Sequence, residues 1–367
     1  MNLTAVLLPW VLACVIAASP QRGVIALAPL ASLPALALAL LPEQAVGLDW
    51  VLLGIGLGAD STSRAFLLLL GSAWTLAGWF ALGRVTTDPR SFWVFWLLTL
   101  TGINLVFLAR DAAGFYCGYA IMTLAGYGLV IHERSGSALR AGRVYLVLGL
   151  IGEALIITGL FLLAARFGNI AFARLPEALG SGSSPAALFL FAGFAVKMGV
   201  LPLHVWLPLA HPVAPVPASA ILSGVIVKAG LLGWLRFLPP EIFATPPPTL
   251  LLVTLGLIGA FYAALMALTQ ERPKTILAWS TVSQLGLLLA LFAATLRSPL
   301  AREVMVPVLG LWVLHHGLNK AALFLAVGSA PLAGRWRMLL LALPALSISG
   351  LPLTSGGLAK DAAKAGF

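Results

Sequence analysis

Charged residues are scarce in this chain. Only 9% of its 367 residues are charged, whereas soluble domains carry about 25%. Acidic residues number just 12, and hydrophobic residues make up 60% of the chain. So little polar surface cannot cover a folded protein in water, and an ordinary soluble domain is therefore excluded. The expected surroundings are a lipid bilayer.

Cysteine is scarce as well. Cys14 and Cys117 both lie inside apolar runs and have no ligand-like neighbours, which excludes a disulfide framework, a zinc site and an iron–sulfur cluster. The first apolar run has no Lys or Arg before it, as a cleavable signal peptide would need, so it is expected to remain as a helix. The sequence also has no nucleophile triad, phosphate loop or dinucleotide fingerprint. We therefore expect no cofactor and no metal.

Long apolar runs, separated by Pro, Gly or charged residues, fill the chain. About 20 apolar residues suffice to cross a bilayer as a helix. The expected fold is an all-α polytopic membrane protein with about 12 transmembrane helices, near residues 3–19, 23–42, 62–84, 91–109, 112–132, 141–166, 185–209, 216–238, 248–269, 274–296, 303–330 and 336–362. Residues 43–61 are expected to form a partly ordered external loop, and 167–184 an interfacial helix that ends in a flexible linker.

Basic residues cluster in the short connections between these runs. Ten fall on one side of the predicted membrane: Arg22, Arg84, Arg90, Arg134, Arg140, Arg143, Arg272, Lys274, Arg335 and Arg337. Seven fall on the other side: Arg64, Arg110, Arg166, Arg174, Arg236, Arg297 and Arg302. The positive-inside rule makes the first side cytoplasmic and puts the N-terminus outside a cell inner membrane. The net charge of +10 thus reports topology, and no nucleic-acid partner is expected.

Four lysines lie inside apolar runs: Lys197, Lys228, Lys320 and Lys360. A charged side chain at bilayer depth costs about 3 kcal/mol or more, so it persists mainly beside a hydrated path or a counter-charge. A lysine taken out of water holds its proton less tightly, and histidine exchanges protons near neutral pH. Lysine and histidine in such spans therefore indicate proton movement, with no bond made or broken.

The span near 185–209 is predicted to break close to mid-membrane. Prolines cannot continue one uninterrupted helix, and five of them follow each other here: Pro202, Pro208, Pro212, Pro215 and Pro217. Backbone groups freed at such depth are tolerated only against protein or water. Lys197 precedes the break, His204 and His211 follow it, and Lys228 lies in the next span. These four residues are predicted to line one hydrated path.

A second set of residues has the same character. His316 and Lys320 are four residues apart and share a helix face. The last span is interrupted by Gly350 and Pro352, and Lys360 follows. Two broken helices at corresponding places are typical of transporters built from inverted repeats. The predicted division is N-terminal helices at 1–90, a first repeat at 91–238 and a truncated second repeat at 239–367.

These segments resemble the antiporter-like proton-translocating subunits of respiratory complex I (L, M and N), of Mrp-type antiporters and of group 4 hydrogenases. AVKMGVLPLHVWLPLAHPVAPVPASAILSGVIVKAG (195–230) is similar to the family's broken seventh helix and the helix after it, with Lys197 and Lys228 at its two central lysines. RPKTILAWSTVSQLGLLLA (272–290) resembles its loop and tenth helix, HHGLNKAALFLAVGS (315–329) its eleventh, and GLPLTSGGLAKDA (350–362) its broken twelfth.

The chain departs from the family pattern in three respects. Where the family has Trp-Glu-Leu-Met in its fifth helix, this chain has the segment 119–122, Tyr-Ala-Ile-Met, so the glutamate that would pair with Lys197 is missing. Glu153, the acidic residue predicted inside a span, is hypothesised to supply that charge. Leu209 replaces the family's Asp in the broken-helix motif. Family members also continue beyond Lys360, so either a partner subunit completes the wall or the sequence is a piece of a longer protein.

The resemblance implies a non-redox subunit of a proton-translocating, oxidoreductase-type translocase. The implied roles are a switch at Lys197, a relay at Lys228, His204, His211 and His316, a connector at Lys320 and an exit group at Lys360. Expected partners are other membrane subunits and a peripheral driving module. Two alternatives stay open: an antiporter or ion-coupling subunit for another cargo, such as sodium or bicarbonate, and a non-conducting scaffold.

Overall fold

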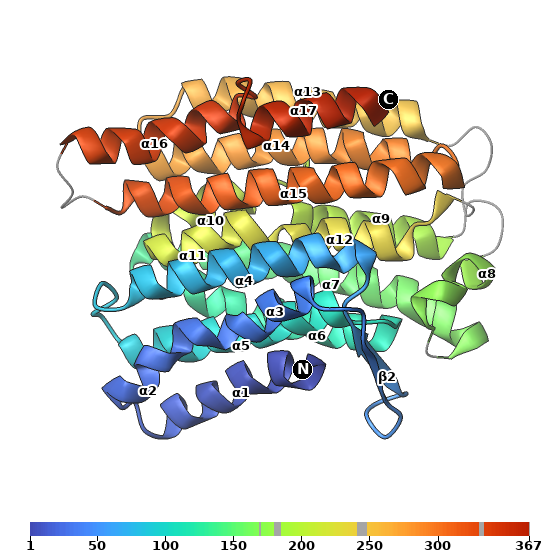
Figure 1. The fold of residues 1–367 in the computed structure, drawn as a ribbon, viewed down its shortest axis with the longest axis horizontal. Coiled ribbons are helices and arrows are strands. Elements are labelled where there is room, and N and C mark those ends of the chain that lie inside the picture. Colours follow the sequence, from blue (N-terminus) through green and yellow to red (C-terminus); the bar gives the residue numbers. More distant parts are fainter. Residues whose placement is uncertain (169, 180–184, 241–247, 330–333, 367) are drawn as a thin grey trace.

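The structure is a computed structural model that describes residues 1–168, 170–179, 185–240, 248–329 and 334–366. Within these residues the chain forms a bundle of helices that lie roughly along one direction (Figure 1). Nine helical segments of this part are long and apolar enough to cross a membrane. The fold is therefore mostly helical and multi-pass, as expected. The count of about 12 spans and the inverted repeats stay predictions.

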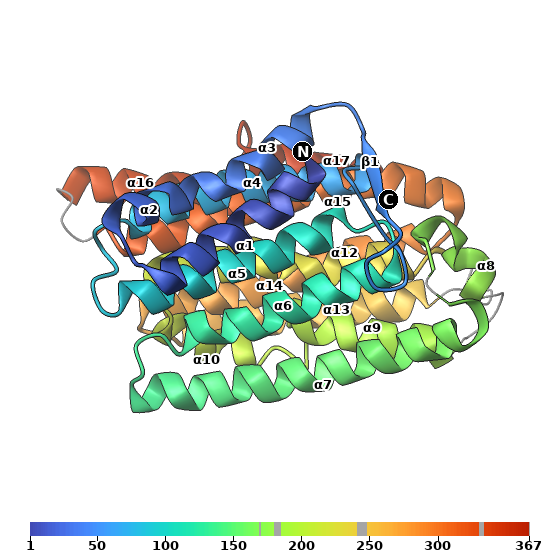
Figure 2. The same cartoon turned by 90° about the horizontal axis from the view of Figure 1, so that it is seen from below.

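The first part of the chain contains α1 (Asn2–Ala18) and a bent span of α2 (Arg22–Leu27), η1 (Ala28–Ser32) and α3 (Leu33–Leu40). It continues with α4 (Ser61–Ala81), α5 (Pro89–Leu108), α6 (Ala112–Val130) and α7 (Gly136–Phe167). Figure 2 shows α7 along one edge of the bundle.

The second part begins with η2 (Phe172–Arg174), α8 (Leu175–Leu179), α9 (Pro185–Met198) and α10 (Trp206–Val213). It continues with α11 (Val216–Ile221), the π-helical turn η3 (Leu222–Ile226) and α12 (Lys228–Phe237). The last helices are α13 (Thr249–Leu268), α14 (Pro273–Thr295), α15 (Pro299–Val327), α16 (Gly334–Ile348) and α17 (Ser355–Gly366). Of the segment 167–184, predicted as an interfacial helix that ends in a flexible linker, η2 and α8 form short helical turns, and residues 180–184 lie outside the described residues.

The segment 43–61 is more ordered than we expected. It contains an antiparallel hairpin of β1 (Ala45–Leu48) and β2 (Ile55–Gly58), so the fold is not purely helical. Ile55 and Leu57 of β2 are buried, and Leu57 forms a β-bridge to Ala109 at the end of α5. Ile55 and Leu57 are alternate residues of one strand and point to the same side, so their burial anchors this connection to the bundle. We call the end of the bundle that carries the hairpin the hairpin end.

Close packing between helices depends on glycine. A Cβ on Gly102 of α5 would lie 2.4 Å from the backbone nitrogen of Met122 in α6. A Cβ on Gly256 of α13 would lie 2.5 Å from the carbonyl oxygen of Gly286 in α14. In lipid, such close packing replaces the hydrophobic effect as the force that joins helices. The helices that carry polar side chains are thereby held in fixed positions.

The first predicted helix break is present. Helix α9 ends at Met198, Gly199 has a φ of +65°, and the chain becomes helical again at Trp206. Trp206 Nε1 donates to the carbonyl oxygen of Val196 at 2.9 Å. This bond pairs one of the carbonyls that a helix end leaves without an intrahelical partner.

The second predicted break is present as well. Helix α16 ends at Ile348, Gly350 has a φ of +77°, and α17 begins at Ser355. A Cβ on Gly356 would lie 1.7 Å from the carbonyl oxygen of Ser347, closer than any real contact. Only glycine therefore allows α17 to pack this closely on the end of α16.

Candidate functional site

Lys197 lies one residue before the end of α9, next to α6 and α7. It is buried, and its Nζ donates to Oγ1 of Thr123 at 2.8 Å. The ammonium also lies 5.4 Å from the ring centroids of Tyr119 and of Tyr145, within the range of cation–π attraction. A cavity of about 10 Å³ beside Lys197 has room for about one water molecule. This lysine is thus held by a hydroxyl group and two aromatic rings.

Glu153 of α7 is buried, and its charge acts on Lys197. The ion pairs found among the described residues do not include these two side chains, so their charged atoms are more than 4.0 Å apart. Neither carboxylate oxygen has hydrogen-bond geometry to a protein group within the described part of the chain, although the Thr123 hydroxyl that holds Lys197 also acts on this carboxylate. The hypothesis that Glu153 replaces the missing glutamate stays a prediction, and this position is compatible with it.

Lys228 and Lys320 are connected by hydroxyl and carbonyl groups. Lys228 Nζ donates to the carbonyl oxygen of Ser223 at 2.6 Å, and Ser223 Oγ lies 2.7 Å from Thr281 Oγ1. Thr281 Oγ1 donates to the carbonyl oxygen of Leu277 at 2.8 Å, and Lys320 Nζ donates to the same oxygen at 3.1 Å. Both lysines are completely buried. Helices α12, α14 and α15 thus share one buried polar network.

The π-helical turn η3 explains how Lys228 reaches Ser223. The amide of Val227 bonds back to the carbonyl of Leu222, so it does not pair with the carbonyl of Ser223 as it would in an α-helix. Lys228 Nζ donates to that carbonyl instead. Such π-helical turns occur frequently at functional sites.

His211 and His316 lie beside the same two lysines. The charges of Lys228 and Lys320 act on both histidine rings, and the charge of Lys274 acts more strongly than either on His211. Both rings are completely buried, and all four of their nitrogen atoms lack a hydrogen-bond partner among the described residues. Buried polar atoms of this kind normally bond to ordered water. The structure therefore brings four of the predicted site residues into one cluster: Lys228, Lys320, His211 and His316.

His204 lies apart from this cluster. Its ring packs against those of Trp279 and Tyr262, with centroid distances of 5.2 Å and 5.9 Å. In the part of the chain that the structure describes, its Nδ1 is buried and has no partner.

Lys360 lies in α17, just after the second break, and is exposed, unlike the other three lysines predicted inside spans. Its Nζ donates to the carbonyl oxygen of Gly350 at 3.2 Å. The break is joined to α15 by His315, whose Nδ1 lies 3.0 Å from Ser355 Oγ. Ser355 Oγ in turn lies 2.9 Å from Ser347 Oγ. His315 is therefore satisfied by protein groups, in contrast to its neighbour in the sequence, His316.

Sequence reasoning missed the hydroxyl groups that contact the lysines, namely those of Thr123 and Ser280, and the linked hydroxyls of Ser223 and Thr281 between Lys228 and Lys320. It also missed the two tyrosines beside Lys197. One signal was available, because Tyr119 and Thr123 are four residues apart and share a helix face. Serine and threonine are otherwise common in membrane helices, where they often bond only to their own backbone.

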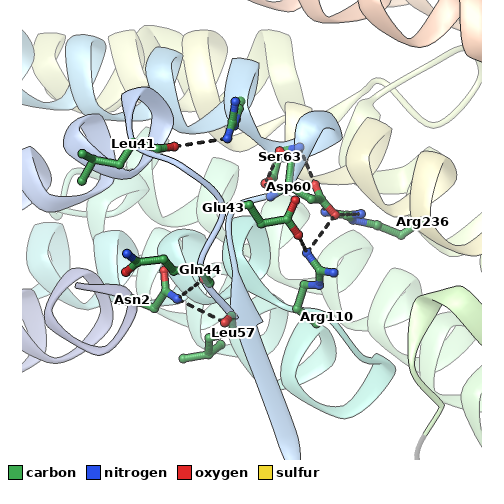
Figure 3. Close-up of polar contacts among 10 residues, drawn as sticks. Asn2, Leu41, Glu43, Gln44, Leu57, Asp60, Ser63, Arg110 and Arg236 are labelled. Atoms are coloured by element: carbon green, nitrogen blue, oxygen red, sulfur yellow. Dashed lines mark hydrogen bonds and ion pairs between the residues drawn. The ribbon is translucent and has the colours of Figure 1, made fainter. Parts of the chain in front are cut away.

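A separate polar cluster lies at the hairpin end (Figure 3). Both terminal nitrogens of Arg236 donate to the carboxylate of Asp60, at 2.6 and 2.8 Å. Arg110 pairs with Glu43 at 2.5 Å and lies 3.7 Å from Asp60. Burial alone would raise the pKa of Asp60, but its hydrogen bonds and the charge of Arg236 hold that pKa below the ordinary value. The cluster ties the segment before the hairpin, the start of α4, the α5–α6 connection and α12 together.

Comparison with known proteins decides the family. A family model described as "NADH:quinone oxidoreductase/Mrp antiporter, TM" matches residues 109–363, which is more than half of the chain. The chain belongs to this family. The resemblance drawn from the four sequence segments is therefore confirmed, and the family match includes all eight predicted site residues.

Curated relatives carry names from the same family. The chain is 34% identical over 229 residues to hydrogenase-4 component B of Escherichia coli, covering 60% of this chain and 34% of the relative. It is 31% identical over 296 residues to NAD(P)H-quinone oxidoreductase chain 4 1 of Picosynechococcus, covering 77% of this chain and 52% of the relative. The chain thus spans about half, or less, of the curated relatives it matches.

Two solved structures share the fold. The membrane-bound sulfane sulfur reductase, an archaeal respiratory membrane complex, contains a chain with a TM-score of 0.85 and 20% identity, and the match covers 100% of this chain and 81% of that one. The Mrp complex from Dietzia sp. contains a chain with a TM-score of 0.83 and 22% identity, covering 100% and 73%. At these identities the likeness is one of fold alone.

Proposed function

We propose that the chain is a proton-translocating membrane subunit of a larger energy-coupling complex in a cell inner membrane. Family membership and the names of its relatives support this assignment. The observation that carries it is the cluster of His211, His316, Lys228 and Lys320. In it, four fully buried imidazole nitrogens have no protein partner among the residues that the structure describes.

Proton transfer needs groups that can both accept and donate. Backbone carbonyls accept only, so the carbonyls of Ser223 and Leu277 hold the two ammonium groups without passing a proton. Neutral imidazole accepts at one nitrogen and donates at the other. In this proposal His316, with ordered water at its nitrogens, relays protons between Lys228 and Lys320, beside the hydroxyl groups of Ser223, Thr281 and Ser280, and His211 contributes from α10.

Lys197 is the switch in this proposal. The rings of Tyr119 and Tyr145 and the hydroxyl of Thr123 stabilise its charged form, and the carboxylate of Glu153 adds a negative charge nearby. No tight ion pair has to be broken before the ammonium can move, because Glu153 is not in contact with it. His204 would serve a side branch next to α13 and α14, and Lys360 would release the proton at the second break.

The proposed activity requires a partner. Relatives of the chain are named as chains or components of quinone oxidoreductases and a hydrogenase. We propose that other membrane subunits complete the path and that a peripheral module drives it. The proposed organisation keeps N-terminal helices at 1–90, repeats at 91–238 and 239–367, and the N-terminus outside.

The experiment is proton flux in proteoliposomes that contain the assembly purified through a tag on this chain. Lys228→Met and Lys320→Met, which replace buried ammonium groups with apolar side chains, are expected to lower flux at least tenfold. Lys364→Met, at an exposed lysine near the C-terminus, is the matched control and should conduct normally. Flux that survives in all three variants would instead support a scaffold. Flux that requires a sodium gradient would support the antiporter alternative.

A further inference from the structure

Lys274 lies in the first turn of α14 and is only partly buried. Its Nζ donates to the carbonyl oxygen of Ala214 at 2.6 Å. Ala214 follows the last residue of α10 and lies three residues after His211. Lys274 therefore joins the start of α14 to the connection between α10 and α11, next to a histidine of the buried cluster.

The backbone at this connection is held by side chains. Pro215 has no N–H to offer the carbonyl of His211, and Ser219 Oγ donates to that oxygen at 2.9 Å. The same hydroxyl donates to the carbonyl oxygen of Ala214 at 3.3 Å. The imidazole of His211 takes no part in these bonds, because neither of its nitrogens has a partner in the described part of the chain. Both nitrogens are thus left for ordered water.

The charge of Lys274 connects it to this ring. Three lysines act on His211 through their charges, and Lys274 acts more strongly than Lys320 or Lys228. Two cations this close repel each other. His211 therefore takes up a proton most readily at the moment when Lys274 gives one away.

Lys274 lies at the end of the bundle opposite the hairpin end. The carboxylate of Asp111, just before α6, accepts from the amide of Gly56 in the hairpin at 2.6 Å. From there α6 runs along the bundle for 19 residues, about 28 Å, to Val130 (Figure 2). The connection after α6 contains Glu133, which is exposed and whose charge acts on Lys274. We call this end the arginine-rich end, because it carries Arg134, Arg140, Arg143 and Arg272.

The two lysines of the cluster cannot exchange protons with water directly. Lys228 and Lys320 are completely buried, as are His211 and His316. Lys274 is partly exposed and acts on one of these rings. It therefore lies between the aqueous surface and the buried cluster.

We propose that Lys274 is the residue through which protons enter the cluster from water at the arginine-rich end, an inference that rests on the proposed function. An N–H bond of the Lys274 ammonium breaks, and its proton passes through an ordered water to a nitrogen of neutral His211, where a new N–H bond forms. The neutral amine then takes a proton from water at the surface, and the negative charge of Glu133 favours this step. The carbonyl of Ala214 holds Nζ in place throughout.

A purely structural role for Lys274 predicts a different order of variants. Arginine keeps the positive charge and the N–H donors but does not release a proton in proteins. Histidine is shorter, yet it exchanges a proton near neutral pH. Structural support would therefore be preserved best in Lys274→Arg, whereas proton entry would be preserved better in Lys274→His.

The test is proton flux through the tagged assembly in proteoliposomes under an imposed membrane potential. Lys274→Arg should lose flux by about tenfold or more, while the assembly keeps its subunits and its melting temperature. Lys274→His should conduct better than Lys274→Arg and better than Lys274→Met. Arg272→Met, at an exposed position two residues earlier, is the matched control and should conduct normally.

The inference is overturned if Lys274→Arg conducts at least as well as Lys274→His, because charge and hydrogen bonding would then suffice. An equal loss in Arg272→Met also overturns it, because any positive charge at this end would then have the same effect. If Lys274→Arg does not assemble, the comparison of Lys274→His with Lys274→Met decides, and equal flux in those two rejects proton entry here. Lys228→Met in the same series separates the two proposals. A loss there beside normal flux in Lys274→Arg rejects only the entry residue, whereas normal flux in both rejects the proposed function as well.

Discussion

The adjacent histidines of α15 should respond in opposite ways to replacement by leucine. His316 is completely buried, and neither ring nitrogen has a partner among the described residues. His315 lies 3.0 Å from Ser355 Oγ and 3.2 Å from Asn319 Nδ2 through its Nδ1. The ring of His316 is thus placed to exchange protons with water and with the two lysines, whereas the ring of His315 joins α15 to α17.

The expected magnitudes follow from these contacts. The ring nitrogens of His316 bond to no protein group among the described residues, so His316→Leu deletes no hydrogen bond between protein groups there. His316→Leu should therefore change the free energy of unfolding by no more than about 1 kcal/mol. His315→Leu deletes the hydrogen bond to Ser355 of α17 and the contact with Asn319 within α15, and should cost about 1–2 kcal/mol. Proton flux should fall at least tenfold in His316→Leu, which is about 1.4 kcal/mol of barrier, and stay near wild type in His315→Leu.

Both quantities can be measured on one preparation. Flux is followed with a pH-sensitive dye inside proteoliposomes under a potassium diffusion potential, and stability by thermal unfolding of the same assembly in detergent. The reasoning is refuted if His316→Leu conducts normally. It is also refuted if His316→Leu is the less stable of the two variants, because its ring would then be a structural element.

Three further predictions concern other parts of the fold. Asp60→Asn breaks a largely buried ion pair with Arg236 and should cost about 3 kcal/mol, seen as a lower melting temperature. The pKa of Asp60 is lowered on folding, so its contribution to the free energy of unfolding is complete above the ordinary pKa of 3.8 and is lost as the pH falls through the lower folded value. The melting temperature of wild type should therefore approach that of Asp60→Asn in acid. A constant difference between the two melting temperatures would contradict this. Gly356→Ala adds a Cβ 1.7 Å from a carbonyl oxygen of α16 and should cost at least about 1–3 kcal/mol, so an unchanged melting temperature would rule out this packing. Glu153→Gln should lower proton flux because it removes the negative charge that acts on Lys197, and wild-type flux in this variant would end the hypothesis that Glu153 replaces the missing glutamate.

Much of the helical fold could be predicted from local sequence. Runs of apolar residues mark the spans, and the breaks follow from proline and glycine chemistry that acts within a few residues. The hairpin at 45–58 was missed because its strands are only four residues long and gain their order from contact with α5. Its stability depends on tertiary packing, which a short alternating pattern does not reveal.

The site could be predicted only in part. Burial of Lys197, Lys228 and Lys320 was expected from their apolar neighbours, and the structure confirms it. Which polar groups meet depends on how the helices rotate and pack, so the separation of His204 from His211 could not be seen in the sequence. The exposure of Lys360 likewise depends on what packs against the second break.

The central claim is that protons cross this chain along its buried lysines and histidines. The most direct test is proton flux through the purified assembly in proteoliposomes, with Lys197→Ala compared with wild type under the same imposed membrane potential. Our account predicts that the variant assembles with the same subunits and loses most of the flux. Equal flux in the two preparations would contradict it and leave the lysine axis without a role in conduction.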